Sequence, residues 1–332
     1  MSKRILAVLL ILFLLAGIPI LNVSAAEDDD VLRMIVIGNS YGYDSTQLLW
    51  KVYQTQNPDK KIQVGAMYYS GCSVEQHLNF IRQGSAVYDY KRTDENGNWV
   101  TSNDVTMETG LLDQQWDIVI LMQGSGRGGV DSFYFTNGQI QKLQEYVLST
   151  LEVEPQFYWN LTWVQPQDTY FQDPDYMTQP PEDWANTLLN KTNGDQLAYY
   201  RRFAEGARTY IASDPTFAKV LTPGTAIQYA NNMLGQTDRD LYRDYTHLSD
   251  FGRLIAAHTI YCQIEGLTTL GSVNMDMVER SLRHAKFQQY GDLTVTAEQK
   301  QIILNAVNHT LKNPYEVPDT PVTAERCMNC TI

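Results

Sequence analysis

Short apolar runs alternate with helical segments along most of this chain. The clearest run is 117–122, and others lie at 32–37, 61–67, 156–164 and 218–221. Uninterrupted runs this short are typical of strands that are buried on both faces. Strands that alternate with helices form right-handed βαβ units. The pattern therefore predicts an α/β protein with a mainly parallel sheet and helices on both faces.

The segments between these runs predict the helices. Apolar residues recur at helical spacing in about 46–56, 73–83, 139–151, 194–213 and 248–264. One stretch differs, because Asn96-Gly97 is flanked by short strand-like segments, which predicts a hairpin insertion near 86–105. Residues 165–190 are rich in Pro, Gln, Asp and Tyr. They predict a long loop, and such loops at the carboxyl ends of parallel strands form binding sites.

The first residues predict an export signal. Lys3 and Arg4 precede an uncharged stretch over 5–21, and small residues at 23–26 suit a cleavage site. The alternative, an uncleaved membrane anchor, is disfavoured because Gly17 and Pro19 interrupt a stretch already short for a span. We therefore expect a signal peptide over 1–26 and a secreted protein with no stable membrane anchor after cleavage. The remainder predicts one main domain over 27–265 and a helical extension over 266–332 that packs on it.

Composition excludes several classes of partner. The formal net charge is -13, from 38 acidic and 25 basic residues, so we expect no nucleic-acid partner. The five His are scattered and His-Glu-x-x-His is missing, so no metal or cofactor is predicted.

Two further motifs have uncommitted roles. A Gly-x-Gly-x-x-Gly pattern at 124–129 fits a loop at the rim of a site better than a dinucleotide loop. The tail cysteines Cys327 and Cys330 suggest a disulfide or free thiols.

A serine and a histidine at opposite ends of the α/β pattern are the candidate catalytic pair. Ser40 follows the first predicted strand, at the edge where open α/β sheets bind ligands. A serine needs a nearby base to act as a nucleophile, and His247 stands just before the last strong helix. Asp244 could accept from Nδ1–H of that imidazole and stabilise its protonated form.

Acyl transfer also needs donors for a developing oxyanion. Gly71 follows the second predicted strand, where its N–H can face the site without steric cost. Gln123 ends the third strand and carries a side-chain amide. Gln76 and His77, about one helical turn after Gly71, are further candidates to reach the site.

These motifs resemble the blocks of the SGNH (GDSL-type) hydrolase superfamily, and within it a bacterial subgroup catalogued as a domain of unknown function. The resemblance covers about 33–265. The four blocks fall on Gly38-Asn39-Ser40, Gly71, Gln123 and Asp244-x-x-His247. Two positions depart from the family pattern, because many members have Asp in place of Asn39 and most have Asn in place of Gln123.

The resemblance implies a fold and a set of roles. The fold would be the SGNH hydrolase fold, a three-layer α/β/α sandwich with a mainly parallel, flavodoxin-like sheet. Ser40 would be the nucleophile, His247 the base, and Asp244 the residue that orients the base. The oxyanion hole would consist of the Ser40 N–H, the Gly71 N–H and the Gln123 amide.

From this pattern we expect a secreted serine esterase. It would hydrolyse O-acyl esters, O-acetyl groups on carbohydrate first, through an acyl-Ser40 intermediate, with a small-molecule or polysaccharide ester as substrate. The alternative is a non-catalytic carbohydrate-binding protein on the same scaffold. In that case aromatic side chains would stack on sugar rings, the candidates being Trp163, Trp184, Tyr170 and Tyr176.

Overall fold

The computed structural model describes residues 30–124, 132–165, 195–234, 241–243, 246–278 and 293–319. The fold given below is that of the unit Val31–Ile332. The cysteine pair of the tail and the loop predicted over 165–190, apart from Gln165, lie outside the described residues. So do the export signal and parts of the helical extension expected over 266–332.

A seven-stranded sheet forms the centre of the fold, in the order β4-β3-β2-β1-β5-β6-β7. The five strands from β2 to β7 in this order run parallel to one another, as in flavodoxin-like sheets. They are β1 (Val31–Gly38), β2 (Lys61–Tyr68), β5 (Ile118–Met122), β6 (Gln156–Asn160) and β7 (Phe217–Leu221). The predicted α/β fold with a mainly parallel, flavodoxin-like sheet is confirmed.

Alternating side chains of the central strand enter two hydrophobic cores. Met34 and Val36 of β1 point into one core, and Ile35 and Ile37 into the other; all four are buried. A strand covered on both faces must be apolar at every position, which is why β1 and β5 read as continuous apolar runs.

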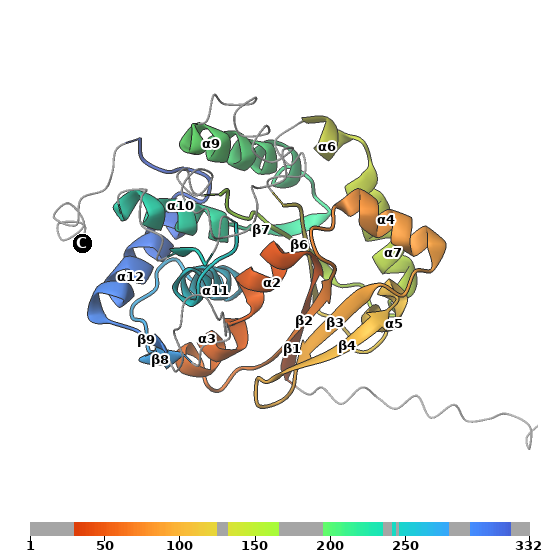
Figure 1. Ribbon diagram of the computed structural model, residues 1–332, viewed down its shortest axis with the longest axis horizontal. Helices are drawn as coiled ribbons and strands as arrows, with labels where there is room; N and C mark the ends of the chain where they lie inside the picture. The colour runs from red at the N-terminus through yellow and green to blue at the C-terminus, as the bar shows by residue number, and fades with distance from the viewer. Residues whose placement is uncertain are drawn as a thin grey trace, which may run out of the picture. The chain divides into compact units, whose positions relative to one another are not determined.

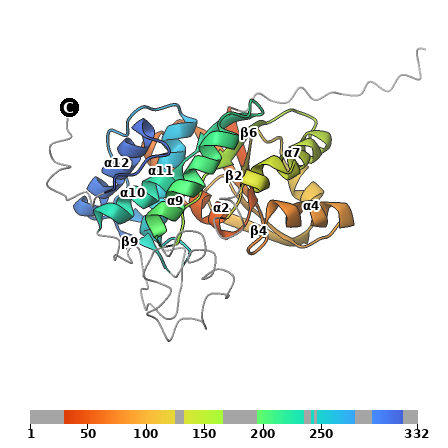
Figure 2. The same cartoon turned by 90° about the horizontal axis from the view of Figure 1, so that it is seen from above.

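Helices cover both faces of the sheet, as Figures 1 and 2 show from two directions. One face carries α2 (Ser40–Thr46), α3 (Leu49–Gln56), α10 (Pro223–Met233), α11 (Asp250–Ile264) and α12 (Ala297–Lys312). The other carries α4 (Val74–Gln83), α5 (Met107–Leu111), α6 (Ser132–Thr136), α7 (Gln139–Thr150) and α9 (Gln196–Gly206), which continues as the π-helix η3 (Ala207–Ile211). The result is the three-layer α/β/α sandwich. A short antiparallel pair, β8 (Met277–Val278) with β9 (Leu293–Thr294), precedes α12.

The hairpin that contains Asn96-Gly97 forms the edge of the sheet. It consists of β3 (Tyr88–Thr93) and β4 (Trp99–Val105), and β3 pairs antiparallel to β2. Gly97 has φ +78°, and a Cβ there would lie 2.1 Å from the ring of Trp50 on α3. The turn therefore requires glycine both for its backbone angle and for its contact with Trp50.

The apolar pattern misses one helix between β1 and β2. The spacing of apolar residues predicts a helix over about 46–56, which corresponds to α3, whereas the separate helix α2 starts at Ser40, two residues after β1 ends. Its residues 40–46 have little apolar periodicity, and most of them are buried regardless. The helix is defined instead by the cap at Asn39, so periodicity alone could not locate its start.

Among the residues that the structure describes, no helix has both the length and the apolar character that a membrane span requires.

Two histidines are buried in the helical layers. His77 on α4 is 1% exposed, its Nδ1 lies 2.9 Å from the Tyr88 hydroxyl, and burial lowers its pKa from 6.5 to about 3. His258 on α11 is fully buried, and burial lowers its pKa to about 4. In the window between about pH 3 and 6.5 the unfolded chain therefore binds more protons at these positions than the folded chain does.

We predict that this burial makes the free energy of unfolding fall as pH drops below about 6.5. The contribution of neutral, buried His77 to the free energy of unfolding is fully present above pH 6.5 and is lost progressively as the pH falls toward 3. In His77→Phe the free energy of unfolding should depend less steeply on pH. Between pH 4 and 6 its slope against pH becomes shallower by about 1.4 kcal/mol per pH unit, the value for one bound proton. Urea denaturation at several pH values measures the slope, which is independent of any constant packing loss. Parallel curves for the two proteins would contradict the assignment.

Candidate active site

Three of the residues predicted for the site follow neighbouring strands of the sheet. Ser40 comes two residues after the end of β1, Gly71 follows β2, and Gln123 directly follows β5. β1 lies between β2 and β5, and all three run parallel. Their carboxyl ends therefore meet at one edge, where open α/β sheets bind ligands.

Asn39 fixes the start of α2 and connects it to the segment after β2. Its Oδ1 accepts from the Tyr41 N–H at 3.0 Å, which is the N-cap bond of the helix. Its Nδ2 donates to the Cys72 carbonyl oxygen at 2.9 Å. The side chain is 3% exposed, so both bonds are buried. Ser40 is thereby held as the first residue of α2, and its N–H is among the first-turn groups that have no partner within the helix.

Gly71 lies in a turn that only glycine adopts without strain. Its φ is +61°, and the Cys72 N–H donates to the Tyr69 carbonyl oxygen across the turn at 3.2 Å. Ser73 then caps α4 in a capping box with Gln76.

The expectation that Gln76 or His77 reaches the site is wrong. Gln76 accepts from the Ser73 N–H through Oε1 at 3.0 Å and so completes the cap of α4. His77 faces Tyr88 on the hairpin in the second core.

Gln123 is 1% exposed and is oriented by its neighbours. Its Oε1 accepts from the Val74 N–H, at the start of α4, at 3.2 Å, and its own carbonyl accepts from the Thr162 hydroxyl at 3.4 Å. A side-chain amide that accepts through Oε1 on one side presents its Nε2–H groups, which are donors, on the other. Gln is one methylene longer than the Asn expected from the resemblance. This extra length lets Oε1 of Gln123 reach the start of α4.

His247 approaches α2 from a distant part of the chain. Its ring centroid lies 6.4 Å from that of Tyr41, the residue after Ser40. The Tyr41 hydroxyl also makes a short hydrogen bond with the hydroxyl of Thr246, which is 205 residues away in sequence. The Trp163 Nε1–H donates to the Thr246 carbonyl oxygen at 2.8 Å. The structure thus brings the predicted serine and histidine to the same edge of the sheet. Asp244 lies outside the described residues.

Trp163 was a candidate for stacking on sugar rings, and that expectation is wrong. The side chain is fully buried, with its ring centroid 5.0 Å from that of Tyr41. Its role is to support Tyr41 and the loop that carries His247. The other three aromatic candidates, Trp184, Tyr170 and Tyr176, lie outside the described residues.

Several residues around the site carried no signal in the sequence. Tyr41 and Thr246 meet through their hydroxyls, and Asp44 on α2 bonds the backbone next to His247. Only the position of Asp44, one helical turn after Ser40, could have drawn attention to it. No group of three or more His, Cys, Asp or Glu able to hold a metal ion occurs within the part of the chain that the structure describes.

These features define an α/β protein with a serine and a histidine at the carboxyl edge of a flavodoxin-like sheet. The chain belongs to the family described as a domain of unknown function, DUF4886, whose model matches residues 33–281. No curated protein matches it in sequence.

Solved structures with a similar fold include a member of the same family. A DUF4886 protein from Bacteroides uniformis is 20% identical, with a TM-score of 0.67, over 87% of this chain and 98% of that one. A gut microbial diltiazem-metabolizing enzyme (12% identity, TM-score 0.40) matches over 71% of this chain and 47% of its own. A salicylyl-acyltransferase from a tetracycline biosynthetic pathway (12%, TM-score 0.34) matches over 71% and 54%. The first comparison supports the fold, and the latter two are too distant to support an argument about chemistry.

We predict that Asn39→Ala lowers the free energy of unfolding by about 2 kcal/mol or more. The substitution removes an N-cap, worth about 1 kcal/mol, and leaves the buried Cys72 carbonyl oxygen without this donor, at about 1–3 kcal/mol. Asn39→Ser is the matched control, because serine can cap α2 but cannot reach Cys72. Compared with Asn39→Ala, Asn39→Ser should recover about 1 kcal/mol of the free energy of unfolding, the contribution of the N-cap bond alone. Equal stability of Asn39→Ala and wild type in urea denaturation would contradict this account.

Proposed function

We propose that this protein is a serine esterase of the SGNH type, with Ser40 as nucleophile and His247 as general base. The observation that carries the proposal is the meeting of the two segments at one edge of the sheet. Ser40 begins α2, and the residue after it, Tyr41, contacts both the ring of His247 and the hydroxyl of Thr246. A hydroxyl and an imidazole brought to the ligand-binding edge of an α/β sheet are the parts that acyl transfer requires.

The reaction proposed has two steps. In the first, His247 takes the proton of Ser40 as Oγ attacks the ester carbonyl carbon. The tetrahedral intermediate then collapses, the protonated imidazole gives its proton to the leaving alkoxide, and the acyl group stays on Ser40. In the second step His247 activates a water molecule, which releases the carboxylic acid and restores Ser40. By the family resemblance, Asp244 orients His247.

The developing oxyanion would be stabilised by three donors. Two are backbone N–H groups, of Ser40 at the start of α2 and of Gly71 in its left-handed turn. The third is Nε2 of Gln123, on the side of the amide opposite the Oε1 that bonds Val74. Each such donor typically contributes about 3–4 kcal/mol to transition-state stabilisation.

The proposed substrates are O-acyl esters, with O-acetyl groups on carbohydrate as the first class to test. This class follows from the superfamily resemblance, and the net charge of -13 favours neutral over acidic carbohydrates. The alternative function is non-catalytic carbohydrate binding on the same scaffold. The burial of Trp163 removes one of the aromatic residues that this alternative would use.

We also propose that the protein is exported, as Lys3, Arg4 and the uncharged stretch over 5–21 suggest. If so, N-terminal sequencing of the protein from the medium of a secreting host gives a chain that begins at Glu27, after the predicted cleavage site. Recovery only of a cell-associated chain that retains Met1 would contradict export.

The esterase proposal predicts that wild type hydrolyses p-nitrophenyl acetate and releases acetate from an acetylated, neutral polysaccharide. Ser40→Ala should lose at least about 10³-fold in kcat, because removal of a nucleophile disables the whole unit. A fluorophosphonate probe should label wild type on Ser40, and mass spectrometry of the labelled peptide locates the adduct.

The control is Ser45→Ala, which removes a buried hydroxyl from the same helix. That hydroxyl donates to the Gly42 carbonyl oxygen and accepts from Asn160 Nδ2, and neither partner belongs to the proposed catalytic pair. Ser45→Ala should leave probe labelling at Ser40 intact. Equal turnover by wild type and Ser40→Ala would exclude the mechanism. If neither protein turns over but wild type binds the polysaccharide, the non-catalytic alternative holds.

A further inference from the structure

We infer that Asp44 is a positioning residue, which anchors the loop of His247 to the helix that begins with Ser40. The inference rests on the proposed function and deepens it. It assigns a role to a buried carboxylate that takes no part in the two-step reaction.

Asp44 lies on the same short helix as the nucleophile. It is four residues after Ser40 on α2, about one turn along, and its side chain is 1% exposed. α2 packs against α11, the helix that follows His247. The carboxylate is therefore enclosed between the helix of the nucleophile and the segment of the base.

The partners of Asp44 flank His247 on both sides. The N–H of Leu248, the residue directly after His247, donates to Oδ2 at 3.0 Å. Arg243, four residues before His247, donates from Nη1 to Oδ1 at 3.0 Å and to Oδ2 at 2.9 Å. One carboxylate thus bonds the chain just before Asp244 and just after His247, the two residues of the predicted catalytic block.

The residues before and after His247 are also bonded to each other. The Arg243 N–H donates to the His247 carbonyl oxygen at 3.0 Å, and Tyr242 forms an isolated bridge with Leu248. Arg243 Nη1 also donates to the Leu248 carbonyl oxygen at 2.8 Å. Backbone bonds hold these two segments together, and Asp44 bonds both of them to α2.

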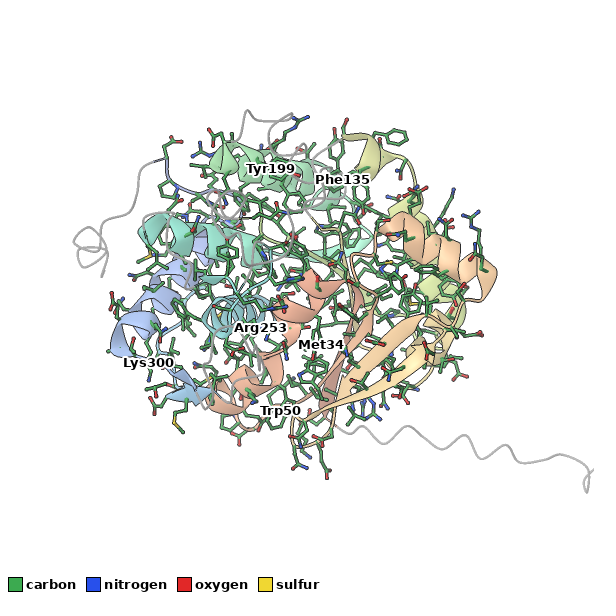
Figure 3. All side chains as sticks on the ribbon, viewed as in Figure 1. Met34, Trp50, Phe135, Tyr199, Arg253 and Lys300 are labelled. Carbon is green, nitrogen blue, oxygen red and sulfur yellow. The ribbon has the colours of Figure 1, made fainter. Side chains whose placement is uncertain are left out.

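A second arginine also pairs with the Asp44 carboxylate. Arg253 on α11, labelled in Figure 3, donates to Oδ1 of Asp44 from Nε at 3.1 Å and from Nη2 at 2.5 Å. Its Nη1 lies 3.3 Å from Oδ1 of Asp250. Among the described residues, Asp44, Asp250, Arg243 and Arg253 form an ion-paired group of two acidic and two basic side chains. Pairing of this kind is what allows ionised groups to remain in a buried position.

The close approach of α11 to the loop depends on a glycine. A Cβ on Gly252 would lie 2.3 Å from the Leu241 carbonyl oxygen, which also accepts from the Ser249 N–H at 2.9 Å. The start of the loop thus lies close to the first turn of α11, the helix from which Arg253 bonds Asp44.

The need for such an anchor follows from the chemistry. Ser40 and His247 lie on segments about 200 residues apart, and proton transfer between them requires hydrogen-bond contact. A displacement of about 1 Å in reacting groups can cost about 100-fold in rate. Because Asp44 shares one helix with Ser40, its bonds set the position of the His247 loop relative to the nucleophile itself.

The test is Asp44→Asn. Asparagine keeps the size and one acceptor oxygen, but its NH₂ group faces the arginine donors. We expect kcat for p-nitrophenyl acetate to fall about 10- to 100-fold, with KM changed less than about twofold, since only proton transfer is impaired. Hydrogen exchange, followed by mass spectrometry, should become faster in the peptide that covers residues 241–249 and stay unchanged in α12.

The matched control is Tyr53→Phe, which removes the hydroxyl bond from α3 to Glu265, the C-cap residue of α11, in the same helical layer. It tests whether loss of any polar contact to α11 has the same effect, and we expect it to leave kcat and exchange at 241–249 unchanged. If Asp44→Asn does not fold, Arg243→Lys replaces it, because lysine keeps the charge but cannot reproduce the several bonds of the guanidinium.

The outcomes separate this inference from the esterase proposal. A normal kcat in Asp44→Asn, or a lowered kcat without faster exchange at 241–249, overturns the positioning role. If wild type has no esterase activity, the proposed function fails, and exchange alone decides whether Asp44 anchors the loop. Faster exchange then supports the anchor, and unchanged exchange overturns it.

Discussion

The site depends on the register in which three parallel strands pair. Gly38 at the end of β1 lies opposite Tyr68 at the end of β2, and Ile37 lies opposite Leu121 of β5. This alignment brings the segments that carry Ser40, Gly71 and Gln123 to one edge. Because strand pairing fixes backbone positions closely, the three segments need only short side-chain bonds between them to become a site. Asn39 bonds the segment after β2, and Gln123 bonds the first turn of α4.

The fourth segment, with His247, cannot be positioned by strand pairing, because it does not follow a strand. Side-chain hydrogen bonds hold this segment instead. The Trp163 indole holds the Thr246 carbonyl oxygen from one side, and the Asp44 carboxylate holds the Leu248 N–H from the other. Both bonds are buried, where a hydrogen bond is electrostatically stronger and a lost partner is costly. The two halves of the proposed catalytic pair are thus positioned by different means, one by the sheet and one by buried polar contacts.

Much of the fold followed from local pattern. The apolar runs located all five parallel strands, since strands buried on both faces must be apolar throughout. Asn96-Gly97 located the hairpin, because its backbone angles suit few other residues. The helix expected at about 46–56 is present as α3, whereas α2 was missed, since residues 40–46 are buried from several directions and show no one-sided stripe. Trp163 was taken as a possible sugar platform, because an aromatic residue in a loop has the same sequence context whether it is exposed or buried.

The sequence by itself determined the alternation of strands and helices, and with it the placement of Ser40, Gly71 and Gln123 at strand ends. Those features depend on burial and on backbone angles, which each short stretch of sequence encodes. Only the tertiary structure decided that Tyr41 meets Thr246 and that Asp44 bonds the backbone beside His247. These contacts join residues about 200 positions apart. Their partners are selected by how α2 and α11 pack, and no local pattern specifies that packing.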